Sequence, residues 1–293
     1  MNKKEFYENF ELNKVYLGDC IELSKKVPDN SIDLIVTSPP YADTVSYGKT
    51  VKTFNPETYV DWFLELFKES QRFLKDTGSF ILNINDKSVN GERSTYVFEL
   101  VCRISKETNL KLFDRYIWFK KSALPMPGDK RLNDRIEYIF HFVKDSKKFK
   151  AYTDRVRIPY KEISLKRFKS KVHGNDIILP DGTTKLSQRG SSKPHPLGAK
   201  PITVFRFDTC SAIRGLEHPA PFHPQLPEFF ISWLTNENDI VLDPFMGGGT
   251  VAEVCVKMKR KYIGFEINPK YIKMTEDRLK KNFPNKKIDE FLN

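Results

Sequence analysis

Short apolar runs and amphipathic stretches alternate along most of this chain, and together they predict its secondary structure. Runs of four to eight apolar, β-branched or aromatic residues are typical of buried strands. In the first half of the chain such runs cover 15–20, 31–37, 79–84, 113–119 and 136–143. Apolar residues at helical spacing predict helices over 21–27, 57–74 and 95–106. The strand over 136–143 is expected to complete a hairpin.

The same alternation resumes after Pro219. It predicts, in order, a helix over Leu226–Leu234, a strand over Ile240–Leu242, a helix over 251–258, a strand over 262–266 and a helix over 269–281. Strands that alternate with helices indicate an α/β fold with a mostly parallel, doubly wound sheet. Ligands of such sheets bind at the carboxyl ends of the strands. We therefore expect the functional residues at that edge.

Residues 144–206 interrupt this pattern with a basic stretch that lacks long periodic segments and is expected to form a loop over 185–201. The stretch holds 16 Lys and Arg against 5 Asp and Glu, which equals the net charge of +11 of the whole chain. A concentrated positive charge predicts a polyanionic partner such as DNA. A solvated insert is the alternative, but aromatic residues interleave with the charges, namely Phe149, Tyr152, Tyr160 and Phe168. Candidate DNA contacts are Lys166, Arg167, Lys169 and Lys171.

The composition excludes several other classes of protein. The 293 residues suit one α/β domain with a sizeable insertion, and no run of about 18 apolar residues predicts a membrane span. The amino terminus is polar and has no apolar stretch typical of a secretion signal. The cysteines are far apart and form no CxxC pair, so we expect reduced thiols in a cytoplasmic protein and no metal site.

A glycine-rich turn follows the strand predicted at Ile240–Leu242. Asp243–Thr250 reads Asp-Pro-Phe-Met-Gly-Gly-Gly-Thr, and Glu266 ends the next strand. Glycines let the backbone turn sharply and approach a ligand closely, and an acidic residue about 20 positions downstream binds ribose hydroxyls in dinucleotide-type sites. The spacings GxxxxGK[ST] and GxGxxG are both absent. The motif therefore predicts a nucleoside ligand without an obvious pyrophosphate.

A second motif, Thr37-Ser38-Pro39-Pro40-Tyr41, follows the strand at 31–37 directly. Two prolines fix φ and make a rigid corner that ends the strand. Such a corner can present the Ser38 hydroxyl and nearby carbonyls as acceptors, with the Tyr41 ring beside them. A flipped nucleobase needs an arrangement of this kind. On its own, a Pro-Pro turn after a strand is more often structural. Its occurrence together with the glycine-rich nucleoside-binding motif favours a functional interpretation.

These two motifs, in this order, resemble the β-class amino-methyltransferases of restriction–modification systems, which make N4-methylcytosine or N6-methyladenine. That family places SPPY or DPPY first, a target-recognition region next and FxGxG last, in a circularly permuted Rossmann-like class I methyltransferase core. Four further segments are similar to family elements, namely Leu17–Cys20, Trp118–Lys121, Arg135–Tyr138 and His218–Phe222. The resemblance covers most of 15–143 and 217–282 and none of 144–206.

The resemblance implies S-adenosyl-L-methionine as the cofactor and a division into three parts. Residues 1–143 are expected to form the catalytic part, 144–206 the target-recognition insert and 207–293 the cofactor-binding part. Ser38, Pro39, Pro40 and Tyr41 form the catalytic motif, in which Ser38 and Pro39 hold the target amino group and Tyr41 stacks on the base. Candidate cofactor residues are Asp19, Cys20, Phe222, Asp243, Phe245, Gly247, Gly249, Thr250 and Glu266.

The chemistry expected from the resemblance is direct methyl transfer to an exocyclic amino nitrogen of duplex DNA. Carbon-5 methylation needs a cysteine nucleophile in a Pro-Cys dipeptide, and no cysteine here follows a proline. Serine at position 38 favours cytosine N4 as the target. Adenine N6, a non-catalytic DNA-binding specificity subunit and an RNA substrate stay open as alternatives. The recognition site, a cognate restriction endonuclease and the choice between monomer and homodimer also stay open.

Overall fold

The computed structural model describes residues 10–42, 56–89, 91–121, 130–169, 177–178, 184–185, 193–207 and 222–284. The chain forms two compact units. One contains Met1–Ala151 and Thr203–Asn293, and the other contains Tyr152–Ile202. The second unit is shorter at both ends than the insert expected over 144–206, because residues at each end of that stretch belong to the larger unit.

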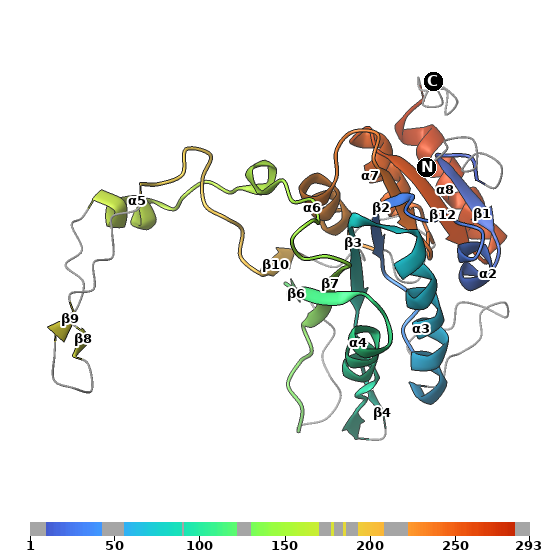
Figure 1. The fold of residues 1–293 in the computed structure, drawn as a ribbon, viewed down its shortest axis with the longest axis horizontal. Coiled ribbons are helices and arrows are strands. Elements are labelled where there is room, and N and C mark those ends of the chain that lie inside the picture. The colour runs from blue at the N-terminus through green and yellow to red at the C-terminus, as the bar shows by residue number, and fades with distance from the viewer. Residues whose placement is uncertain are drawn as a thin grey trace. The chain divides into compact units, whose positions relative to one another are not determined.

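The larger unit is built on an eight-stranded sheet with the order β1-β12-β11-β2-β3-β7-β6-β10 (Figure 1). The strands are β1 (Lys14–Leu17), β2 (Ile32–Thr37), β3 (Leu74–Ile84), β6 (Lys111–Lys120), β7 (Ile136–Val143), β10 (Val204–Phe207), β11 (Ile240–Asp243) and β12 (Lys261–Glu266). Only β7 runs antiparallel to its neighbours among these eight. The expected mostly parallel sheet is confirmed, and β6 and β7 form the expected hairpin.

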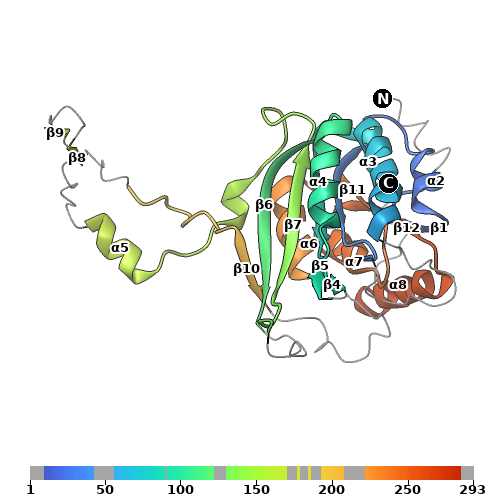
Figure 2. The same cartoon turned by 90° about the horizontal axis from the view of Figure 1, so that it is seen from below.

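Helices cover both faces of this sheet, as a doubly wound fold requires (Figure 2). On one side lie α2 (Cys20–Ser24), α3 (Pro56–Phe73) and α4 (Tyr96–Glu107). On the other lie α6 (Gln225–Leu234), α7 (Thr250–Lys257) and α8 (Pro269–Asn282). No helix in the described ranges is long and apolar enough to cross a membrane.

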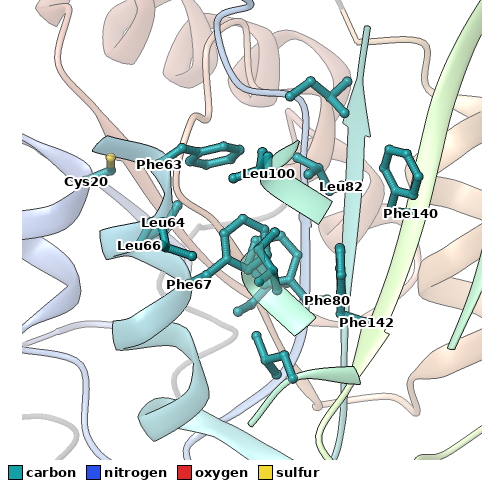
Figure 3. Packing of buried hydrophobic residues seen from close by; sticks show 14 of the residues in the cluster. Cys20, Phe63, Leu64, Leu66, Phe67, Phe80, Leu82, Leu100, Phe140 and Phe142 are labelled. Carbon is teal, nitrogen blue, oxygen red and sulfur yellow. The ribbon is translucent and has the colours of Figure 1, made fainter. Parts of the chain in front are cut away.

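The core on the α3 side rests on aromatic side chains spaced one helical turn apart (Figure 3). Phe63 and Phe67 point from α3 toward the sheet, and the Phe67 ring stacks on Phe80 of β3 at 4.4 Å between centroids. The same ring meets Phe142 of β7 edge-on at 5.6 Å. Alternate residues of β3 therefore face α3, since successive side chains of a strand point to opposite faces. This packing anchors the strand that lies beside β2.

Two of the boundaries that differ from the sequence prediction have a local physical cause. The chain turns directly from α3 into β3 at Leu74, so the segment expected to separate helix from strand belongs to the strand. Gly78 allows this, because a Cβ there would lie 2.9 Å from the carbonyl oxygen of Asp33 in β2. At the other site, β1 ends at Leu17 rather than at residue 20, because Asp19 caps α2.

The basic residues at the start of the expected insert are partly neutralised within the larger unit. Lys144 Nζ lies 3.0 Å from Asp76 Oδ1, and Lys150 Nζ lies 3.1 Å from Asp33 Oδ1. Phe149 packs on Phe113 at 4.5 Å. These residues support the sheet. The charges of Lys144 and Lys150 are paired with acidic residues and are therefore not part of a free basic surface. At the far end β10, which was expected to belong to the insert, pairs with β6 as an edge strand.

The second unit, Tyr152–Ile202, keeps 11 Lys and Arg against 4 Asp and Glu. Its described part contains a 3-10 turn at Thr153–Val156, α5 (Glu162–Lys169) and the short antiparallel pair β8 (Ile177–Ile178) and β9 (Thr184–Lys185). A backbone bridge joins Ile158 to Ala199. The Tyr160 hydroxyl accepts a hydrogen bond from the His195 backbone at 3.0 Å. Tyr160, one of the interleaved aromatics, therefore has a structural contact.

Candidate active site

The carboxyl ends of the parallel strands bring the two sequence motifs together. β2 and β11 are neighbours in the sheet, so Thr37 and Asp243 end adjacent strands. The Thr37 hydroxyl donates a hydrogen bond of 2.6 Å to Asp243 Oδ1. The same oxygen accepts from the Phe245 backbone at 3.0 Å. One buried carboxyl thus joins the start of the Pro-Pro turn to the start of the glycine-rich turn.

Burial is the main electrostatic influence on Asp243. It raises the pKa of this carboxyl from 3.8 to about 7, against the hydrogen bonds from Thr37 and Phe245, which lower it, while Glu266 raises it further. Removing a carboxylate from water penalises its charged form. The group is therefore part protonated near neutral pH, in the middle of the candidate site.

We expect this titration to appear in the stability of the protein. Between about pH 4 and 7 the folded state keeps the Asp243 proton that the unfolded chain releases, so the free energy of unfolding should fall as the pH rises through this window. One linked proton gives a slope of at most about 1.4 kcal/mol per pH unit. Urea unfolding at several pH values measures it. Asp243→Asn keeps the acceptor oxygen and should flatten the curve; an unchanged curve would contradict the assignment.

The glycine-rich turn is bound to the end of β12. Gly247 and Gly249 have φ of 51° and 76°, in the left-handed region that favours glycine. The Gly247 N–H donates to Glu266 Oε2 at 2.8 Å, and Glu266 Oε1 accepts from the Asn268 backbone at 2.9 Å. Burial raises the pKa of Glu266 although these bonds lower it. Each carboxylate oxygen can accept more than one hydrogen bond, so Glu266 still suits ribose hydroxyls.

Helix α8 holds the same turn from the other side, which the sequence did not reveal. The Thr275 hydroxyl donates to the Gly247 carbonyl at 3.1 Å. Arg278 donates to the Gly248 carbonyl and to the Thr250 hydroxyl, each at 3.0 Å, and pairs with Glu253 of α7. Thr250 begins α7 and is buried. These contacts fix the backbone of the turn before any ligand binds.

Asp19 and Cys20 follow β1, whose last residue pairs with Glu266 at the end of β12. The Gly18 N–H donates to the Glu266 carbonyl at 3.0 Å. Asp19 Oδ1 caps α2 by accepting from the Ile21 and Glu22 backbones at 2.9 and 3.2 Å. Cys20 is buried, and burial raises the pKa of its thiol. The structure thus gives Asp19 a capping role, whereas its expected contact with the cofactor stays a prediction.

The aromatic candidates are packed to different degrees. Phe245 is partly buried and lies edge-on to Trp62 and Phe63 of α3, at 5.8 and 5.7 Å. Phe222 packs against the core on the α6 side. Ile267 is exposed directly after Glu266, at the same edge of the sheet. Sequence reasoning did not include this apolar side chain among the candidate site residues.

A hydrogen-bonded cluster surrounds the Pro-Pro turn. The Tyr41 hydroxyl lies 3.3 Å from Ser38 Oγ and donates to Glu137 Oε2 at 2.7 Å. Asn83 Nδ2 reaches the Tyr41 oxygen at 2.6 Å and the same carboxylate oxygen at 2.5 Å. Lys120 pairs with the other carboxylate oxygen at 2.6 Å. Burial, with the Glu137 charge second, raises the pKa of Tyr41 well above its ordinary value.

This cluster contains three residues that sequence reasoning did not assign to the site, namely Asn83, Lys120 and Glu137. Ser38, Pro40 and Tyr41 are partly buried, and Pro39 is buried. The Tyr41 ring therefore has its hydroxyl end fixed among polar groups. Strand β7 runs antiparallel to β3 and β6, so its first residues lie at the edge of the sheet where those two strands end. Glu137, near the start of β7, lies opposite Trp118, near the end of β6.

The candidate DNA contacts lie in the second unit. Lys166 is exposed on α5. Arg167 and Lys169 fall in the same helix, but their side chains lie outside the described residues, and so does the whole of Lys171. Their expected role stays a prediction.

Comparison with known proteins identifies the family. The family model described as DNA methylase (N6_N4_Mtase) matches residues 32–277. The chain belongs to this family of N6/N4 DNA methylases. The type II methyltransferase M.PvuII of Proteus hauseri is 31% identical to this DNA methylase over 304 residues, which cover 95% of the chain and 87% of the relative. The DNA adenine methyltransferase YhdJ of Escherichia coli (strain K12) is 28% identical over 277 residues, covering 92% and 83%.

Solved structures agree with the fold of this DNA methylase. The PvuII DNA methyltransferase (cytosine-N4-specific) matches with a TM-score of 0.67 and 27% identity, over 95% of this chain and 89% of that one. The M1.HpyAVI–SAM complex matches with a TM-score of 0.59 and 20% identity, over 91% and 98%. The fold is therefore the class I methyltransferase core that the motif order predicted. Members of the family are DNA methyltransferases that use S-adenosyl-L-methionine.

Proposed function

We propose that this DNA methylase transfers a methyl group to N4 of cytosine in a specific duplex site, after the base is flipped out of the stack. The observation that carries the proposal is the position of Ser38 in the Pro-Pro turn, directly after Thr37, which is hydrogen-bonded through Asp243 to the turn that would hold the cofactor. The likeness to a cytosine-N4-specific enzyme supports it. The likeness to an adenine methyltransferase keeps adenine N6 as the second candidate.

The chemical difficulty of the reaction lies in the target nitrogen. Its lone pair is delocalised into the ring, which makes the amino group a poor nucleophile. Hydrogen bonds from this group to Ser38 Oγ and to the Pro39 carbonyl would draw the nitrogen toward tetrahedral geometry and localise the lone pair. Positioned acceptors cost no reorganisation during the reaction. Bound S-adenosyl-L-methionine supplies an electrophilic methyl group, and proton loss can follow transfer without a strong base.

The remaining candidates would position the two ligands. Glu266 suits the ribose, the backbone of Gly247 and Gly249 suits close approach, and Asp19, Cys20, Phe222, Asp243, Phe245 and Thr250 complete the proposed cofactor set. Tyr41 would stack on the flipped base. Taking the base out of the duplex costs a few kcal/mol, and the contacts made in the site must offset this cost. This fit follows from the chemistry of the donors and from the tight turn that the left-handed φ of the two glycines allows.

Recognition of the site would fall to the second unit. Its excess of basic residues suits phosphate contacts, which position a duplex, while a few side chains read base edges. Lys166, Arg167, Lys169 and Lys171 are the proposed contacts. A cognate restriction endonuclease is a proposed partner, since relatives of the chain are type II methyltransferases.

The product distinguishes the two candidate bases directly. DNA methylated by the purified protein is digested to nucleosides and analysed by mass spectrometry, with DNA treated by Ser38→Ala as the background. We expect N4-methylcytosine. N6-methyladenine alone would assign the chain to the second candidate, and a tritium-labelling assay with duplex DNA and single-stranded RNA in parallel checks the substrate class.

A further inference from the structure

The cluster behind the Pro-Pro turn contains an ion pair that the proposed reaction does not use directly. Glu137 is 8% exposed, and its carboxylate accepts from Lys120 on one oxygen and from Tyr41 and Asn83 on the other. A buried charge costs stability unless it is paired and hydrogen-bonded, so the three donors together stabilise this carboxylate. Its position one contact away from Ser38 calls for a functional explanation.

The direction of each hydrogen bond in the cluster follows from the carboxylate. An ionised carboxylate only accepts hydrogen bonds, so the Tyr41 hydroxyl must donate its single proton to Glu137 Oε2. Asn83 faces the same oxygen at 2.5 Å and must therefore present its amide nitrogen. The Tyr41 oxygen is left as an acceptor, for Asn83 at 2.6 Å and for the neighbouring serine at 3.3 Å.

The direction of the Tyr41 hydrogen bond decides how the hydroxyl of Ser38 is oriented. Because Tyr41 has no proton left for Ser38, the contact between them requires Ser38 to donate. The Ser38 proton then points back into the protein, and the lone pairs of Ser38 Oγ remain for a donor in the site. An amino group is such a donor. Without Glu137 the Tyr41 proton could turn to Ser38 and occupy the acceptor.

We propose that Glu137, held by Lys120 and Asn83, is a positioning residue that makes Ser38 a hydrogen-bond acceptor for the target amino group through Tyr41. The inference rests on the proposed function, in which Ser38 accepts from that group. Glu137 itself does not touch the substrate. Its influence passes through one phenolic proton, so it should vanish when that proton is removed.

A double-mutant cycle tests this coupling, since residues that act through one another show non-additive effects. Glu137→Gln replaces the acceptor with an amide that can also donate, and the single-turnover methylation rate should fall about 10- to 100-fold. The dissociation constant for S-adenosyl-L-methionine should stay within about twofold. In a Tyr41→Phe background, which lacks the proton, the same substitution should change the rate by less than about threefold.

Controls separate this inference from the proposed function. Glu65→Gln removes an exposed carboxylate of α3 that pairs only with Lys68 among its described ion pairs, and it should leave the rate unchanged. If Ser38→Ala has no effect on the rate, the proposed role of Ser38 fails. If Ser38→Ala slows methylation but Glu137→Gln does not, or slows it equally in both backgrounds, only the positioning role fails. Lys120→Gln is the second variant should Glu137→Gln not fold, and the Tyr41→Phe background should cancel its effect in the same way.

Discussion

Replacing Ser38 with alanine should slow methyl transfer by about 10²- to 10³-fold, the scale of losing one positioned hydrogen bond at a reacting group. The substitution removes the hydroxyl that is proposed to face the target nitrogen and leaves the rigid Pro39-Pro40 corner intact. The hydroxyl of Tyr41 keeps its hydrogen bonds to Glu137 and Asn83, so the arrangement of the site should be preserved. The loss should appear in the single-turnover rate rather than in the affinity for the cofactor, because Ser38 is not among the proposed cofactor contacts.

Ser31 provides a matched control for this prediction. It lies just before β2, at the opposite end of the strand from Ser38, and its hydroxyl donates to the Pro28 carbonyl at 2.6 Å. Ser31→Ala should lower the free energy of unfolding by about 1 kcal/mol, as expected for a lost buried hydrogen bond, and leave the rate unchanged. Ser38→Thr retains a hydroxyl and should recover part of the activity. Wild-type activity in Ser38→Ala would remove Ser38 from the mechanism.

Replacing Gly249 with alanine should destabilise the protein by about 2–5 kcal/mol and weaken cofactor binding. A non-glycine residue at φ 76° costs about 1–2 kcal/mol. The added Cβ would also lie 2.5 to 2.8 Å from three side-chain atoms of buried Thr275, and overpacking of a filled core costs about 1–3 kcal/mol more. Since Thr275 also bonds to the Gly247 carbonyl, any adjustment moves the whole turn. Urea unfolding and calorimetric titration with S-adenosyl-L-methionine measure the two effects.

Gly91 separates the two contributions. Its φ is 85°, similar to that of Gly249, but an added Cβ would meet nothing within 4 Å. Gly91→Ala should therefore carry only the backbone cost of about 1–2 kcal/mol. The difference between the variants measures the clash, and the Gly249→Ala/Thr275→Ala pair should be less destabilised than the sum of the single changes. Equal destabilisation in Gly249→Ala and Gly91→Ala would show that the clash is relieved at no cost.

Local sequence was enough to predict the parallel sheet, its two chemical motifs and their meeting at one edge. The reason is that apolar periodicity reports burial, while prolines and glycines constrain φ within a few residues. Glu266 and the turn that contains Ser38 could thus be singled out from local sequence, the resemblance to amino-methyltransferases added Gly247, and the family comparison agrees with the chemistry that they suggested. The basic excess over 144–206 was also readable, but not the fact that Lys144 and Lys150 pair with acids of the sheet.

Long-range packing determined the rest of the candidate site. Glu137 is 96 residues from Tyr41 in the chain, and it reaches the hydroxyl only because β7 runs against β3 and β6. Thr275 and Arg278 reach the glycine-rich turn because α8 folds back over it. Neither contact has a local signature, since the direction of one strand and the packing of one helix depend on the whole sheet. The groups proposed to bind the methyl donor and the target are therefore visible in the sequence, whereas the contacts that hold and orient them appear only in the fold.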